Sequence, residues 1–127
     1  MLISKKFSFD AAHFLPYYDG KCRNVHGHRW YIEVACSGKV DDNSGMVVDF
    51  TVLKQFCNDI KLRYDHGSLN DHFENPTAEN IGRDILSDFT SWCKDKGLLS
   101  EYVRVWESED SMVELRRDYL TDIVRCV

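Results

Sequence analysis

The stretch Lys21–His28 concentrates residue types that bind metals and transfer protons, because two imidazoles stand two residues apart and a thiol precedes them. If the chain runs on from His26 as a strand, His26 and His28 project from one face, since alternate strand side chains share a side. Trp30 and the following residues of the same parity are apolar. The two histidines therefore end an apolar strand face and form a candidate metal-binding pair.

A third imidazole, His13, ends a similar alternating stretch. From residue 3 to residue 13 the odd positions are mostly apolar and the even positions mostly polar, so His13 also ends the apolar face of a predicted strand. Three imidazoles with one open position are typical of catalytic Zn²⁺, whereas structural zinc usually has four protein ligands. We expect His13, His26 and His28 to bind Zn²⁺. The alternative is that they are polar strand and loop residues that never meet.

Six short motifs occur in order along nearly the whole chain. They are Phe9-Asp10-Ala11-Ala12-His13, Cys22-x-x-x-His26-Gly27-His28, Val48-Asp49-Phe50, Asp65-His66 with Leu69-Asn70, Pro76-Thr77-Ala78-Glu79-Asn80, and Val105-Trp106-Glu107-Ser108. Their order and spacing resemble those of the 6-pyruvoyl tetrahydropterin synthase and 6-carboxytetrahydropterin synthase family. The chain departs from that pattern at Arg29-Trp30, Tyr64 and Ser108, none of which is implied in metal binding or proton transfer.

The resemblance implies an α+β tunnelling fold, in which the elements follow the order strand-strand-helix-helix-strand-strand and the helices cover one face of an antiparallel sheet. It implies that Cys22 accepts a proton, that Asp65 and His66 relay protons, and that Glu107 anchors a pterin ring. Thr77 would be a weaker pterin contact. It also implies a homohexamer of two stacked trimers, whose sheets close into a barrel and so pair the exposed strand edges.

The activity implied by the resemblance is that of a zinc-dependent lyase acting on 7,8-dihydroneopterin triphosphate. The short spacing between Cys22 and His26 resembles the members that form 6-carboxy-5,6,7,8-tetrahydropterin, with release of triphosphate and acetaldehyde, on the route to queuosine and other 7-deazapurines. The alternatives are a 6-pyruvoyl product, an aldolase-like cleavage, and a non-catalytic metal-binding module. A metal-binding module would need the histidines but no acid–base set.

The neighbours of Cys22 also suggest a role for its thiol, because Cys22 lies in a loop between the cations Lys21 and Arg23. Neighbouring cations favour the thiolate, so Cys22 is a candidate for proton transfer. As a fourth zinc ligand it would close the site and stop catalysis, and this alternative stays open. Lys21 could hold a phosphate group, as Lys and Arg commonly do, or could be solvated surface.

Each of the remaining candidates could also have a structural role and no function in catalysis. In a loop, Asp65 can orient the imidazole of His66, whose basicity suits proton transfer near neutral pH, yet a lone His66 is more often a surface residue. Glu107 ends the inner face of a predicted strand, where a carboxylate needs a partner such as the paired N–H groups of a pterin. Thr77 is equally explained as a helix cap.

Length and composition bound the class of protein. The 127 residues predict a single domain spanning residues 1–127, with 43% hydrophobic and 29% charged content. With a formal net charge of −5, the chain lacks the excess of basic residues that is typical of nucleic-acid-binding proteins. Five widely spaced cysteines without a C-x-x-C motif predict a reducing, cytoplasmic location. No stretch approaches the roughly 20 apolar residues of a membrane span, so no membrane partner is expected.

Hydrophobic periodicity predicts the elements that must position these groups. We expect strands over 2–13, 26–38, 101–107 and around 113–115. A short extended piece at 46–48 would lead to Asp49, a predicted N-cap, and to a helix ending before Gly67. A second helix would open at residues 75–77, with Pro76 in its first turn, and end at Gly97.

Overall fold

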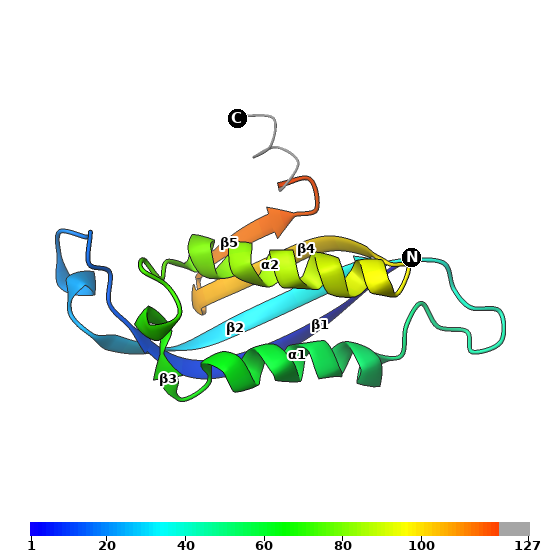
Figure 1. Cartoon of the computed structure of the whole chain (residues 1–127), viewed down its shortest axis with the longest axis horizontal. Coiled ribbons are helices and arrows are strands. Elements are labelled where there is room, and N and C mark those ends of the chain that lie inside the picture. Colours follow the sequence, from blue (N-terminus) through cyan, green and yellow to red (C-terminus); the bar gives the residue numbers. More distant parts are fainter. Residues whose placement is uncertain (120–127) are drawn as a thin grey trace.

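The computed structural model describes residues 1–119 and places a five-stranded sheet beneath two helices (Figure 1). Two 3₁₀ turns, η1 (Lys21–Arg23) and η2 (Leu69–Asp71), lie in the connections. The regular elements are β1 (Leu2–His13), β2 (His26–Ser37), α1 (Phe50–Tyr64), β3 (Gly67–Ser68), α2 (Ala78–Asp95), β4 (Leu99–Ser108) and β5 (Ser111–Arg116).

The sheet has the strand order β3-β1-β2-β4-β5. Strands β1, β2, β4 and β5 pair antiparallel, as expected, and the register places His13 opposite His26 and Ala11 opposite His28. The expectation of a purely antiparallel sheet is wrong in one respect, because β3 pairs parallel with β1. The turn after α1 lies alongside the end of β1, where the His66 N–H donates to the Asp10 carbonyl at 2.7 Å.

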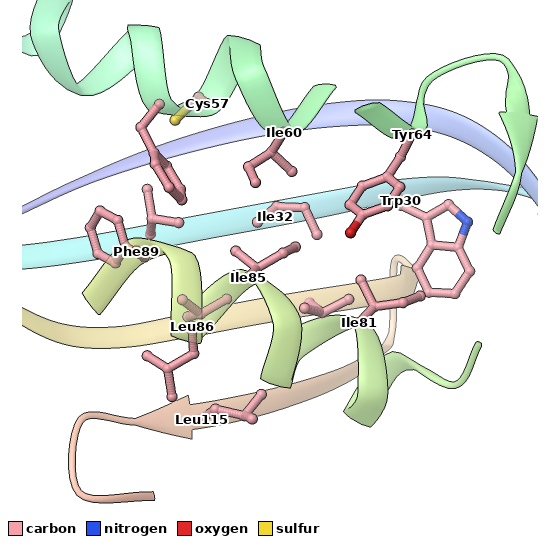
Figure 2. Packing of buried hydrophobic residues seen from close by; sticks show 14 of the residues in the cluster. Trp30, Ile32, Cys57, Ile60, Tyr64, Ile81, Ile85, Leu86, Phe89 and Leu115 are labelled. Carbon is pink, nitrogen blue, oxygen red and sulfur yellow. The ribbon is translucent and has the colours of Figure 1, made fainter. Parts of the chain in front are cut away.

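Both helices pack on one face of the sheet, and the core lies between these two layers (Figure 2). Buried apolar side chains of α1 and α2 form this core with those of the sheet, whereas Phe50, the first residue of α1, is 57% exposed. Burial of these side chains is the main driving force that holds helices to sheet. The fully buried members include Trp30, Ile32, Val34, Val103 and Val105 from the sheet and Leu53, Ile81, Ile85 and Phe89 from the helices.

Capping residues determine where the two helices begin. Asp49 is the N-cap of α1, as predicted, and its carboxylate accepts a hydrogen bond from the Thr51 N–H at 2.8 Å. Helix α2 begins at Ala78, directly after the predicted opening at residues 75–77, because Thr77 is its N-cap and Pro76 precedes the helix. Residues 46–48 form a bend and not the expected extended piece.

The end of α2 is also as predicted. Gly97 has a φ of 69°, a left-handed conformation that glycine adopts without a steric penalty, and it follows the last helical turn. The Leu98 N–H donates to the Cys93 carbonyl at 2.8 Å, which closes that turn. Across residues 1–119, neither helix is both long and apolar enough to cross a bilayer.

Candidate active site

The three predicted ligands His13, His26 and His28 meet at one end of the β1–β2 hairpin. Their ring centroids lie 4.5 Å (His13 to His26), 5.1 Å (His13 to His28) and 4.8 Å (His26 to His28) apart. Strand register explains this meeting, because His13 pairs with His26 and all three side chains share the helix-covered side of the sheet. The ring of Trp30 packs edge-on against His13 and His28, which limits the motion of both imidazoles.

Backbone carbonyls orient two of the three rings. Nδ1 of His13 lies 2.8 Å from the Pro76 carbonyl, and Nδ1 of His26 lies 2.7 Å from the Asn24 carbonyl. A carbonyl only accepts, so in each ring Nδ1 carries the proton and donates, which leaves the Nε2 lone pair free. Hydrogen bonds of this kind fix the tautomer and orientation of metal-binding histidines.

A cation fits this cluster because two of its ring nitrogens are otherwise unpaired. Nε2 of His13 and Nε2 of His28 are buried and have no hydrogen-bond partner. Oε1 of Glu107 lies 3.1 Å from Nε2 of His28 and 3.9 Å from Nε2 of His13. Unpaired buried polar atoms are costly, and a metal ion bound by these lone pairs removes that cost.

Glu107, which was expected to anchor a pterin ring, lies beside the histidines. His13, His26, His28 and Glu107 have ligand atoms within 4.8 Å of one another. Pairing between Trp106 of β4 and Tyr31 of β2 explains the convergence, since it brings the end of β4 beside the histidine end of β2.

Burial favours the neutral form of His13 and His28. Desolvation lowers the pKa of His13 below its ordinary 6.5, against the smaller opposing effects of the Pro76 hydrogen bond and the Glu107 charge. Burial likewise lowers the pKa of His28, with Glu107 opposing. Both rings therefore favour the neutral form, which is the form that binds a metal.

Asp65 and His66 form a second polar group, here called the dyad. Oδ2 of Asp65 lies 2.9 Å from Nδ1 of His66, and the Asp10 N–H donates to Oδ1 of Asp65 at 2.9 Å. The Asp10 hydrogen bond is the largest cause that lowers the pKa of Asp65, so this carboxylate is ionised and orients the imidazole. The His66 side chain is 81% exposed and can reach a bound molecule.

The candidate metal cluster and the dyad face a shared depression. A hollow of about 490 Å³ is lined by both His28 and His66. A neighbouring hollow of about 530 Å³ also includes His28 and extends to Glu107. Asp10, Gly27 and Arg29 line both, and the absence of a side chain at Gly27 leaves the space between them open. One bound molecule in this depression could contact His28, the Glu107 carboxylate and His66 at the same time.

The other predicted residues lie outside this cluster. Cys22 is half-buried in η1, and its carbonyl accepts from the Leu15 N–H at 2.7 Å. No cysteine joins the possible metal groups found among the first 119 residues, which disfavours Cys22 as a ligand within this chain. Lys21 is exposed on the same turn. The Thr77 hydroxyl oxygen accepts from the Asn80 N–H at 3.1 Å, the capping role weighed as its alternative.

A family model described as 6-pyruvoyl tetrahydropterin synthase matches residues 2–118. The chain belongs to this family. It is 45% identical over 117 residues to a protein of Archaeoglobus fulgidus described provisionally as a 6-carboxy-5,6,7,8-tetrahydropterin synthase, covering 92% of this chain and 96% of that one. A 6-carboxy-5,6,7,8-tetrahydropterin synthase of Haemophilus influenzae is 35% identical over 138 residues, covering 88% of this chain and 96% of that protein.

The fold of the family is confirmed as well. The structure of 6-pyruvoyl tetrahydropterin synthase from Caenorhabditis elegans matches with a TM-score of 0.80 at 26% identity, covering 91% of this chain and 94% of that chain. The α+β tunnelling fold expected from the motifs is therefore correct for this family member, with β3 as an addition to the expected order.

Three groups that shape the site of this pterin synthase family member were not predicted to do so. They are the Pro76 carbonyl, the main chain of Asp10 and the side chain of Arg29. Pro76 and Asp10 stand in the motifs that identify the family, but both contribute main-chain atoms, whose partners no side-chain pattern reveals. Arg29 directly follows His28, at a position where the sequence departs from the family pattern.

Proposed function

We propose that the chain is a zinc-dependent 6-carboxy-5,6,7,8-tetrahydropterin synthase acting on 7,8-dihydroneopterin triphosphate. The observation that supports this most is the convergence of three imidazoles, two of which (His13 and His28) have buried, unpaired Nε2 atoms, beside a hollow lined by His28 and His66. The names of the related proteins in Archaeoglobus and Haemophilus point to the same product.

His13, His26 and His28 would hold the zinc ion, and the lowered pKa values of His13 and His28 and the Nδ1 hydrogen bonds of His13 and His26 suit that role. Bound zinc supplies Lewis-acid polarisation of substrate oxygen atoms. Asp65 keeps the His66 imidazole oriented so that its exposed Nε2 can accept or return a proton at the substrate side chain. The Cys22 thiol would exchange a second proton there.

Glu107 would hold the pterin ring through two parallel N–H bonds to its carboxylate. Its place beside His28 puts this anchor within one depression with the metal ligands. Lys21 would contact the triphosphate as a mobile positive charge, and Thr77 would add a weaker contact from the start of α2. Loss of triphosphate and of a two-carbon aldehyde from the three-carbon side chain leaves one carbon on the ring, and a water molecule supplies the second oxygen of its carboxyl group.

The proposal extends to the setting of the enzyme. The whole chain would act as one catalytic domain, in the cytoplasm, on the route to queuosine. It would assemble as a hexamer of two trimers, because β3 and β5 end the described sheet with unpaired edges that a neighbouring subunit can extend. A 6-pyruvoyl product remains the alternative activity, since the family model carries that name.

One assay tests the activity. Purified zinc-loaded protein is incubated with 7,8-dihydroneopterin triphosphate, and the pterin product is identified by mass together with trapped acetaldehyde. We expect a 6-carboxy product and acetaldehyde. A pterin that keeps all three side-chain carbons would identify the pyruvoyl activity, and an unchanged substrate would leave a metal-binding module. His72→Ala, at an exposed histidine outside the cluster, serves as the control and should keep full turnover.

A further inference from the structure

Asp10 connects the end of β1 to the turn that carries the dyad. Its N–H donates to Asp65 at 2.9 Å and its carbonyl accepts from the His66 N–H at 2.7 Å. His66 has a φ of 58°, in the left-handed region that few residues other than glycine occupy. Such a conformation persists where neighbouring structure fixes it, and here the two main-chain hydrogen bonds of Asp10 do so.

The side chain of Asp10 adds a charge beside the same dyad. Ligand atoms of Asp10, Asp65 and His66 lie within 4.8 Å of one another, so two carboxylates flank one imidazole. Arg29, from the neighbouring strand β2, donates from Nε to Oδ1 of Asp10 at 2.9 Å and from Nη2 to Oδ2 at 3.4 Å. This ion pair lowers the pKa of Asp10.

The charged surroundings of His66 are few. Asp65 precedes it on the turn, Asp10 comes from β1, and Arg29 comes from β2. Lys61 of α1 lies beside Asp65, and His28 lines the same hollow as His66. Arg29 is therefore the cation that offsets the Asp10 charge, and its removal would leave that charge uncompensated next to the imidazole.

We propose that Asp10 and Arg29 form a positioning pair that holds the dyad and cancels the charge of Asp10, so that Asp65 is the carboxylate that acts on the imidazole. The pair touches no reacting atom in this scheme and acts through Asp65 and His66. The catalytic part of the inference rests on the proposed function, because it assumes that His66 transfers a proton. The electrostatic part does not depend on that assumption and can be measured directly.

The test uses zinc-loaded protein labelled at histidine, with the ring signal of His66 assigned by its loss in His66→Gln. NMR titration follows that signal in wild type, Arg29→Gln, Asp10→Asn and the double variant. Two charges about 5 Å apart in water shift a titration midpoint by about half a pH unit. We expect Arg29→Gln to raise the midpoint by about that amount, Asp10→Asn to lower it, and the double variant to return it close to wild type.

Two further variants sharpen the result. Arg29→Lys keeps the charge and should titrate like wild type. Arg116→Gln removes an equally exposed arginine from a comparable ion pair, Arg116 to Glu114 at 2.9 Å on β5, and should leave the midpoint unchanged. The Arg29→Gln shift should shrink in high salt, because exposed charges are screened.

The pH profile of kcat/KM separates this inference from the proposed function. If His66 transfers a proton, the limb of the profile that reports it moves with the NMR midpoint in each variant. NMR midpoints that move while the profile stays fixed support the positioning pair and contradict the catalytic role of His66. Coincident NMR midpoints in wild type, Arg29→Gln and Asp10→Asn overturn the positioning pair.

Discussion

The side chain of Asn70 forms two hydrogen bonds with the main chain of Phe14. Oδ1 of Asn70 accepts from the Phe14 N–H at 2.9 Å, and Nδ2 donates to the Phe14 carbonyl at 2.9 Å. Phe14 directly follows His13, and the next residue, Leu15, binds the carbonyl of Cys22. One side chain thus fixes the start of the loop on which the proposed proton-transfer thiol lies.

Asn70→Ala should destabilise the fold, because two partly buried main-chain groups lose their partner. We expect a loss of about 1 to 3 kcal/mol in the free energy of unfolding, measured with chemical denaturant. Asn58→Ala, at an exposed position of α1, is the matched control and should change the free energy little. Equal stability of the two variants would show that water replaces Asn70 without cost.

His28→Ala should lose the metal and the activity together, because it removes one of three imidazole ligands. Metal analysis by mass spectrometry after purification with zinc checks this expectation. The fold should survive, since His28 lies near the start of β2 and is not part of the apolar core. A variant that keeps one zinc per chain would refute this ligand set.

Cys22→Ala should keep stoichiometric zinc while turnover falls by about 10²-fold or more, the usual effect of removing a positioned acid–base group. The reason is that Cys22 lies on η1 and not among the grouped ligand atoms. Zinc content and steady-state rates are measured on the same preparation. Loss of zinc in this variant would place the thiol among the ligands.

Glu107→Gln should weaken pterin binding by at least about 1.5 to 3 kcal/mol, because a charge-assisted acceptor pair becomes a neutral group with one donor. Three imidazoles remain, so we expect zinc content to be unchanged. Calorimetry on metal-replete protein measures the affinity for the pterin. Since the Glu107 carboxylate lies 3.1 Å from His28, loss of zinc would instead identify it as a fourth ligand.

The metal-free protein should lose stability as the pH falls. Burial lowers the pKa of His13 and His28 in the folded state, so the unfolded chain binds protons more readily. The stability from these neutral rings is complete above their ordinary pKa of 6.5 and declines as the pH drops toward the folded values. Denaturant unfolding of chelator-treated protein between pH 8 and pH 5 measures the decline. It should be shallower in His28→Gln, and an equal slope would contradict this cause.

The layered fold and the three imidazoles were predictable because both depend on local periodicity. Alternation along 2–13 and 26–37 assigns His13, His26 and His28 to one face before any pairing is known. Register then brings the strand ends together. The apolar spacing in α1 and α2 likewise identifies the sides that became buried.

The features that were missed depend on contacts between distant segments. Parallel pairing of β3 with β1 involves only two residues and follows from the path of the turn after α1. The approach of Glu107 to His28 depends on the pairing of β4 with β2, and Asp10 holds the dyad mainly through main-chain atoms. Periodicity within one segment contains no information about such encounters.

The hairpin from Leu2 to Ser37 contains all three imidazoles, which has a consequence for the order of events during synthesis. The complete imidazole set leaves the ribosome before α1, while the Pro76 carbonyl and Glu107 follow only later. An isolated two-stranded hairpin is marginally stable in water. We therefore expect the nascent chain to capture metal weakly at first and to retain it firmly only after the segment from Pro76 to Glu107 has emerged and folded against the hairpin.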